Sequence, residues 1–339
     1  MNYMADNGLL FVNQHGFRRS LSCDTQLFEF VTDIHKNLHL RAETHAIFID
    51  FSKAFDKVPH QRLLLKLRSL QIDETLINWI ANFLSNRTQY VTLNNSCSSS
   101  IVVKSGVPQG TVLGPLLFLI YVNDLPSLIK SSIRLYADDC VVNSKVTNRS
   151  DCAQLQADLC AIESWCERWQ MQINVNKTKQ MTFTTKHNTI NFQYSLSGNT
   201  IENVPTYKYL GVNLTSNLSW ENHITHIISK ANQTLGFLRR NLSLASKETK
   251  LLAYTSLVRP QLEYASSVWN PHQLFLEDML EAVQNRAARF IHRNYNFPTS
   301  ITTLKAQHGL PSLKTRRTVS ALTILHKVYY HLPFQKTYT

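Results

Sequence analysis

Apolar residues recur at helical spacing over several long stretches of this sequence. Intervals of three and four residues that persist for about ten residues or more predict amphipathic helices. The stretches with this spacing are residues 22–40, 60–70, 73–84, 150–170, 220–242, 247–258, 274–292 and 313–330. Ser22 or Asp24 is placed to cap the first of them, and Asp73 the third. The last four stretches make the C-terminal third predominantly helical.

Short runs of β-branched and aromatic residues predict strands between these helices. Ala46–Ile49 is typical of a buried strand, and Asp50 follows it directly. Ile133–Tyr136 and Cys140–Val142 predict a tight β-hairpin with two adjacent carboxylates at its turn. Further strands are predicted at residues 88–93, 101–103, 181–185, 194–202 and 207–214. Sheet and helical stretches in this order predict an α+β protein.

The composition indicates a folded chain with a basic surface. Its 339 residues are 43% hydrophobic, which is enough for two or three subdomains with cores of their own. The longest apolar run, Val112–Val122, is shorter than the roughly 20 residues of a bilayer span, so no membrane partner is expected. No secretory signal is recognisable at the N-terminus.

The net charge of +12 predicts an anionic partner, and nucleic acid is the natural candidate. A basic surface without a partner explains the charge alone equally well. The six cysteines contain no C-x-x-C pair, so neither a zinc site nor a disulfide framework is indicated. Reduced thiols fit an intracellular protein, in the nucleus or the cytoplasm.

Two acidic sites and a glycine loop form the candidate chemistry. Asp138 and Asp139 are adjacent in the hairpin turn, and Asp50 ends another strand. Burying like charges is unfavourable unless a cation neutralises them, and hard divalent ions prefer carboxylate oxygens. The loop Ser105–Gly110 lies between these sites in the sequence, and its glycines permit close approach of the backbone to a ligand. The alternative for an isolated acidic pair is a solvated turn.

The order of three motifs, FIDFSKAFD, SGVPQGTVLGPLLF and YADD, resembles the reverse transcriptases of non-LTR retrotransposons of the jockey and CR1 type. The resemblance extends from about Leu9 to the C-terminus. It implies an RNA-directed DNA polymerase with a right-hand fold: a ferredoxin-like palm with an antiparallel sheet, partial fingers and a helical thumb. The expected divisions are partial fingers (1–44), palm with a fingers insertion at about 60–104 and a primer-grip hairpin (45–215), thumb (216–300) and a C-terminal helix or linker (301–339).

The resemblance implies that Asp50, Asp138 and Asp139 are the catalytic acids. It also implies that these residues and Phe51 bind Mg²⁺, or Mn²⁺ in its place, for phosphoryl transfer by two metal ions. The expected partners are an RNA template, a DNA primer and dNTPs. No motif indicates an oligomeric state.

The residues implied to bind the incoming nucleotide are Arg18, Phe55, Gln109, Gly110 and Lys177. Arg18 belongs to the run QHGFR, whose arginine faces the triphosphate in the family, and a guanidinium suits that task. Phe55 corresponds to the aromatic residue that packs under the sugar and excludes a 2′-hydroxyl. Without the neighbouring motifs, Arg18 and Lys177 would be interpreted as solvated turn residues and Phe55 as core.

Lys177, in preference to Lys179, corresponds to the family lysine close to the pyrophosphate leaving group. The residues implied to contact primer or template are Tyr136, Tyr209, Leu210 and Gly211. The last three belong to a run that resembles the primer-grip hairpin.

The sequence also departs from the family pattern. No Arg-Pro-Ile-type fingers motif precedes Gln14, and neither an endonuclease domain nor a C-terminal zinc knuckle is recognisable. One alternative is therefore a truncated, inactive remnant that binds nucleic acid without polymerising. An RNA-directed RNA polymerase fits less well, since those enzymes typically carry glycine before the acidic pair and a second acid in place of Phe55.

Overall fold

A computed structural model of the chain describes residue 4, residues 7–296 and residues 299–330. These residues divide into two compact units. The sheet unit comprises residues 4, 7–26 and 32–205, and the helical unit comprises residues 27–31, 206–296 and 299–330. Helices and sheets occur together as the sequence predicts, so the α+β class is confirmed. None of the helices in the described residues is both long and apolar enough to cross a membrane.

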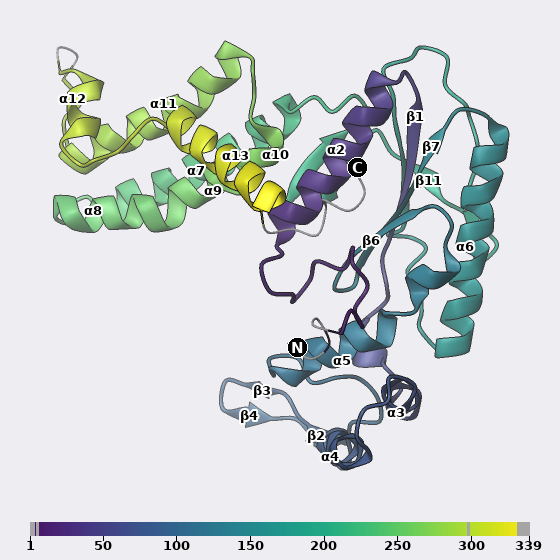
Figure 1. The fold of residues 1–339 in the computed structure, drawn as a ribbon. Coiled ribbons are helices and arrows are strands. Elements are labelled where there is room, and N and C mark those ends of the chain that lie inside the picture. The colour runs from purple at the N-terminus through teal and green to yellow at the C-terminus, as the bar shows by residue number, and fades with distance from the viewer. Residues whose placement is uncertain (1–3, 5–6, 297–298, 331–339) are drawn as a thin grey trace. The chain divides into compact units, whose positions relative to one another are not determined.

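The sheet unit is built on a five-stranded sheet (Figure 1). In spatial order its strands are β11 (Glu202–Asn203), β8 (Lys179–Phe183), β1 (Glu43–Ile49), β7 (Asp139–Val146) and β6 (Ser132–Tyr136). Neighbouring strands are antiparallel except for β11 and β8, which run parallel. Every residue of the central strand β1 is buried, which explains its continuous apolar run.

Helices and short ribbons complete the sheet unit. The helices are α2 (Cys23–His39, which also supplies residues 27–31 of the helical unit), η1 (Phe55–Lys57, 3₁₀), α3 (His60–Ser69), α4 (Glu74–Leu84), α5 (Leu113–Val122), η2 (Leu125–Leu128, 3₁₀) and α6 (Arg149–Trp169). The ribbons pair β2 (Thr88–Gln89) with β5 (Ile101–Val102), β3 (Thr92–Leu93) with β4 (Ser96–Cys97), and β9 (Ser195–Leu196) with β10 (Asn199–Thr200). The predicted caps are confirmed: the Ser22 hydroxyl accepts from the N–H of Thr25, and the Asp73 carboxylate accepts from that of Thr75.

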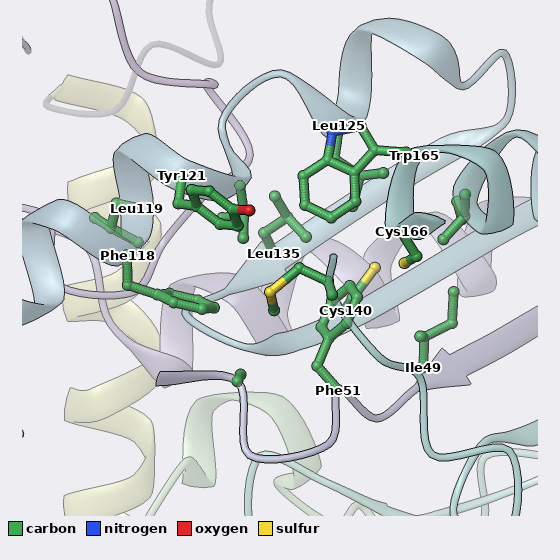
Figure 2. Close-up of a cluster of buried hydrophobic side chains, with 14 of the residues drawn as sticks. Ile49, Phe51, Phe118, Leu119, Tyr121, Leu125, Leu135, Cys140, Trp165 and Cys166 are labelled. Carbon is green, nitrogen blue, oxygen red and sulfur yellow. The ribbon is translucent and has the colours of Figure 1, made fainter. Parts of the chain in front are cut away.

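The core of the sheet unit includes side chains that flank the acidic positions in the sequence. Figure 2 shows Ile49 and Phe51 within a buried cluster that also holds Leu135 and Cys140. These four side chains lie on either side of the acidic positions in the sequence, on the strand end before Asp50 and around the hairpin turn. Burial of each large apolar side chain contributes about 1.5–3 kcal/mol, so the backbone that carries the acids is firmly anchored.

The helical unit begins with a hairpin and continues as packed helices. Its elements are β12 (Thr206–Tyr209), β13 (Val212–Thr215), α7 (Glu221–Asn241), α8 (Lys247–Ala253), η3 (Tyr254–Val258, a π-helix), α9 (Arg259–Glu263), α10 (Ser266–Trp269), α11 (Leu274–His292), α12 (Ile301–Ala306) and α13 (Leu313–Tyr330). Helix α11 packs against α7, α8, α12 and α13. The hairpin groups with these helices, whereas the sequence assigns it to the preceding division.

A buried histidine makes the helical unit sensitive to acid. His223 is 1% exposed, its Nδ1 accepts from the N–H of Asn213 at 3.2 Å, and its ring packs edge-on against Trp269. Burial first, and then the neighbouring charges of His226 and Lys208, lower the pKa of His223 to about 4. An unfolded histidine titrates near pH 6.5, so between these values the unfolded chain binds the extra proton.

Acidification is therefore expected to destabilise the wild type more than His223→Gln, whose amide oxygen can still accept from Asn213. Linkage gives a loss of about 2 kcal/mol from the free energy of unfolding between pH 7 and pH 5 for this one group. Urea unfolding of both proteins at the two pH values measures the difference. Equal losses in both proteins would contradict the prediction.

Candidate active site

Strand register brings the three predicted catalytic acids to one end of the sheet. Ile49 on β1 pairs with Cys140 on β7. Asp50 is the next residue after Ile49, and Asp139 is the residue just before Cys140, so the two acids occupy opposing positions. On the other side of β7, Asp139 pairs with Tyr136 of β6, and Asp138 lies in the turn between them.

The turn that carries Asp138 is a two-residue hairpin connection. Its first residue, Ala137, has a φ of +53°, whereas Asp138 is not in the positive-φ region. This pattern is typical of a type II′ turn, whose first central position usually takes glycine. A residue with a Cβ in the left-handed region costs about 1–2 kcal/mol, so the surrounding structure must hold Ala137 in place.

The segment at residues 13–16 holds this turn from outside the sheet. The N–H of His15 donates to the Leu135 carbonyl at 2.9 Å, and the N–H of Leu135 donates to the Asn13 carbonyl at 3.0 Å. Between them, the Gln14 side chain is 2% exposed. Its Oε1 accepts from the N–H of Ala137 at 3.0 Å and from that of Gly16 at 2.8 Å. Gln14 therefore clamps the strained residue beside Asp138.

Gly16 is required by the same contact. A Cβ at this position would lie 2.4 Å from the backbone nitrogen of Ala137, a distance at which one of the two segments must move. Neither Gln14 nor Gly16 is singled out as a site residue by the sequence pattern, although both belong to the run in which Arg18 was predicted to act. The signal that would find them is the pairing of this run with β6, which is a tertiary contact.

Arg18 ties its own loop together. One terminal guanidinium nitrogen donates to the carbonyls of Phe11 at 2.8 Å, Val12 at 3.2 Å and Gln14 at 3.4 Å. Burial lowers the pKa of Arg18 from its ordinary value. A contact between this arginine and a triphosphate stays a prediction, and the observed bonds give it a structural task beside Gln14.

Burial and mutual repulsion both raise the pKa values of the acids at the turn. Burial and then the charge of Asp50 raise the pKa of Asp138. Burial and then the charges of Asp138 and Asp50 raise the pKa of Asp139 to about 6. Asp139 is exposed to solvent, so a cation can reach it.

These carboxylates fit a hard divalent cation chemically, because oxygen anions are the ligands it prefers and its charge would offset their repulsion. Within the described part of the chain, no group of three or more His, Cys, Asp or Glu side chains is placed to hold a metal ion. A metal site at Asp50, Asp138 and Asp139 therefore stays a prediction.

A lysine reaches Asp50 through a turn fastened to the Asp50 backbone. The N–H of Asn174 donates to the Asp50 carbonyl at 2.7 Å, and the N–H of Asp50 donates to the Thr178 hydroxyl at 3.4 Å. This turn brings the Lys177 ammonium to 4.0 Å from the Asp50 carboxylate. Lys179 instead pairs with Glu202 at 2.7 Å. Lys177 is thus the lysine of the two that lies near Asp50, and its predicted place beside the pyrophosphate stays a prediction.

The glycine loop lies on the segment that follows Asp50. The N–H of Val107 donates to the Phe55 carbonyl at 2.8 Å, and the side chain of Gln109 donates to Asp56 at 3.4 Å. The Phe55 ring stacks on Phe118 with centroids 4.3 Å apart. Gly110, at φ +80°, is exposed on the same loop. Phe55, Gln109 and Gly110, predicted from separate motifs, therefore belong to one local structure.

The hairpin of the helical unit has its own support. The Tyr209 ring packs edge-on against Phe30 with centroids 5.4 Å apart. At the turn, Leu210 and Gly211 both have positive φ, and the Tyr264 hydroxyl donates to the Leu210 carbonyl at 2.8 Å. A recess of about 400 Å³ beside this turn is lined by residues that include Lys208, Lys230 and Tyr264. Sequence reasoning missed Tyr264, because it lies in an irregular segment without a motif.

Comparison with known families accounts for this arrangement. Residues 2–214 match the family described as reverse transcriptase (RNA-dependent DNA polymerase). The chain belongs to the reverse transcriptase family. In this reverse transcriptase, the match covers the acidic turn, the glycine loop and the Asp50 strand, so the family resemblance of the three motifs is confirmed.

Several relatives of the chain are described as RNA-directed DNA polymerases of mobile elements. It is 29% identical over 301 residues to a probable RNA-directed DNA polymerase from transposon BS of Drosophila melanogaster, covering 85% of this chain and 33% of that protein. It is 33% identical over 272 residues to the RNA-directed DNA polymerase from mobile element jockey of Drosophila funebris, covering 76% and 29%. The chain thus spans about a third of the length of these relatives.

Among solved structures, this reverse transcriptase is similar to apo telomerase from Candida tropicalis. The TM-score is 0.52 at 11% sequence identity, and the similarity covers 95% of this chain and 52% of that one. At this identity the likeness concerns the fold.

Proposed function

We propose that this reverse transcriptase synthesises DNA on an RNA template by adding nucleotides to a DNA primer. The observation that carries the proposal is the register that sets Asp50 opposite Asp139, with Asp138 in the adjoining turn, in a chain of this family. Acids brought together from distant segments and raising one another's pKa are typical of a catalytic site.

In this proposal, the two units correspond to the parts of a right-hand polymerase. The five-stranded sheet with α6 is the palm, and the segment from α3 to β5 is the fingers insertion. The helices from α7 to α11 form the thumb, and α12 and α13 belong to the C-terminal segment. Positive charge on such a thumb suits a duplex held through its phosphates, without regard to sequence.

Asp50, Asp138 and Asp139, with the Phe51 carbonyl, would hold two Mg²⁺ or Mn²⁺ ions. When bound, these ions supply electrostatic stabilisation of the attacking 3′-oxygen and of the leaving pyrophosphate. The chain's own task is to keep the carboxylates fixed and charged, which the turn clamp at Gln14 supports. Lys177, close to Asp50, is suited to neutralise the pyrophosphate as it leaves.

The nucleotide is proposed to lie between the Asp50 strand end and the glycine loop. Gln109 and Gly110 would border the nascent base pair, and Arg18 would neutralise the triphosphate. The primer end would lie against the hairpin turn of Tyr209, Leu210 and Gly211, and Tyr136 would contact the strand near the acidic turn. Lys208 and Lys230 line the recess beside that hairpin, and their positive charges suit the phosphate backbone of a primer.

A second candidate function is nucleic-acid binding without polymerisation. It is favoured by the net charge of +12, which suits a phosphate backbone whether or not nucleotides are added. Extension of a labelled DNA primer on an RNA template, with four dNTPs and Mg²⁺, separates the two. Extension that a chelator abolishes supports the polymerase, whereas salt-sensitive hybrid binding without extension supports the second candidate.

Phe55→Val is expected to admit ribonucleotides. The Phe55 ring is held by stacking on Phe118, so its position under the sugar of a bound nucleotide would be rigid. Losing a steric block of this kind changes discrimination by about 10- to 200-fold. The ratio of kcat/KM for dNTP and rNTP insertion measures it.

The matched control for this prediction is Phe83→Val on α4, where the ring stacks on Trp79 instead. Unchanged sugar discrimination in Phe55→Val, or an equal change in both variants, would remove Phe55 from the proposed site.

A further inference from the structure

A basic recess of about 450 Å³ lies within the helical unit, apart from the recess at the hairpin turn. Its lining comes from α7, α8, the connection between them and the C-terminal end of α11. The cations and rings that line it are Arg239, Arg240, Lys250, Arg293, Phe290 and Tyr295. Among the residues that the structure describes, no carboxylate oxygen lies within 4.0 Å of the charged nitrogens of these four cations.

Lys250 forms the floor of this recess. The residue is 1% exposed, and its ammonium donates to the Ser243 carbonyl at 3.1 Å. The ammonium also lies 5.5 Å from the centre of the Phe290 ring. A carbonyl and a ring stabilise a buried ammonium only partly, so taking it out of water leaves a net cost that an anion would offset.

Helix ends explain only part of the clustering. Arg239 and Arg240 lie in the last turn of α7, where the helix dipole favours cations. Arg293 is the C-cap residue of α11, where the same effect applies. The effect does not account for the buried ammonium of Lys250, nor for the meeting of two helix ends at one opening. Four unneutralised positive charges around one recess indicate a polyanionic ligand.

The aromatic side chain of Tyr295 limits which anionic ligands fit the recess. The Arg239 guanidinium lies 5.5 Å from the centre of the Tyr295 ring, and Tyr295 is 55% exposed. A ring that is open to solvent beside a basic recess is the combination with which proteins bind single-stranded nucleic acid. Inorganic phosphate or pyrophosphate would use the cations and leave the ring without a role.

We propose that this recess binds a phosphate of a single-stranded nucleic acid, with the adjoining base stacked on Tyr295. The choice of nucleic acid over a small phosphoanion rests partly on the proposed function. A single strand suits a concave recess because its backbone can bend inward and its bases are free to stack. This would give the helical unit a binding site for unpaired template or product, separate from its grip on a duplex.

The experiment measures binding of fluorescent 12-nucleotide oligouridylate to the full chain, at several salt concentrations. The variant Arg239→Ala, Arg293→Ala is compared with the charge-matched Arg286→Ala, Lys327→Ala, which alters residues outside the recess. The recess variant is expected to bind at least about tenfold more weakly than the charge-matched variant. Loss of this one phosphate contact also lowers the salt slope by about 0.7.

Tyr295 gives a test independent of charge. Tyr295→Ala is expected to weaken binding by about 5- to 100-fold, the range for loss of one stacked base, and Tyr295→Phe to restore it. Equal binding by the recess and charge-matched variants would overturn the proposal. So would displacement of the oligonucleotide by equimolar pyrophosphate, which would assign the recess to a small phosphoanion.

Testing the wild type for both primer extension and oligouridylate binding separates this proposal from the proposed function. Recess-dependent binding by a wild type that does not extend a primer would support the recess and contradict the polymerase. If the wild type extends a primer and the recess variant binds oligouridylate as well as the wild type does, only the proposed role of the recess is contradicted.

Discussion

Asp50→Asn and Asp138→Asn are each expected to lower RNA-templated primer extension by about a thousandfold or more. Both changes keep the size of the side chain and remove the charge. Asp50 ends the central strand and opposes Asp139, so each variant takes one carboxylate from the group proposed to hold the metal ions. Single-turnover extension at saturating dNTP measures the loss.

Stability is expected to move in the opposite direction. The charges of neighbouring acids contribute to the raised pKa values of Asp138 and Asp139. Removing one of these charges therefore relieves repulsion in the metal-free chain. The melting temperature of Asp138→Asn should therefore equal or exceed that of the wild type. A purely structural acid would behave otherwise, because its loss would lower the melting temperature.

The control for both acids is Glu167→Gln on the exposed face of α6, which removes a negative charge far along the sequence from the turn. It should extend primers at the wild-type rate. Extension by Asp50→Asn or Asp138→Asn at the rate of this control would exclude that acid from the catalytic set.

Gln14→Leu is expected to lower the rate of extension by about a hundredfold, because a small misplacement of a catalytic group has effects of that order. The change removes the oxygen that accepts from the N–H groups of Ala137 and Gly16. Ala137 would then lose the bond that holds its left-handed conformation, and Asp138 would be less firmly placed. Gln14 touches no reacting atom in this account, so it is a positioning residue.

A positioning role has a specific kinetic signature. The fall should be in kcat with KM for dNTP nearly unchanged, and Gln14→Leu combined with Asp138→Asn should be no slower than Asp138→Asn alone. Gln14→Glu keeps an oxygen acceptor and should recover part of the rate. Asn13→Ala is the matched neighbour, since Asn13 contacts β6 through its backbone carbonyl. Additive losses in the double variant would contradict the role.

The sequence was informative where residues adjacent in the chain determine the outcome. Ser22 and Asp73 cap the helices expected of them, because a cap depends on a few consecutive residues. The hairpin around Asp138 was predictable from two apolar runs and a short turn. The order of the three motifs predicted that Asp50 acts together with the hairpin acids. The structure adds the strand register that sets Asp50 opposite Asp139.

The pattern of hydrophobic and polar residues did not predict contacts between distant segments. Nothing in the run from Gln14 to Arg18 indicates that it pairs with β6, which lies more than a hundred residues away in the sequence. The short helices α9, α10 and α12, of four to six residues, are too brief to show a helical period. The basic recess likewise combines α7, α8 and α11, so its lone buried lysine had no sequence signal.

The most direct measurement is addition of single nucleotides to a DNA primer on an RNA template, with each dNTP offered separately in the presence of Mg²⁺. The wild type would be run beside Asp138→Asn, Asp139→Asn. The account predicts that the wild type adds only the dNTP complementary to the template base and that the double variant adds none. Hybrid binding by both proteins without nucleotide addition by either would contradict it.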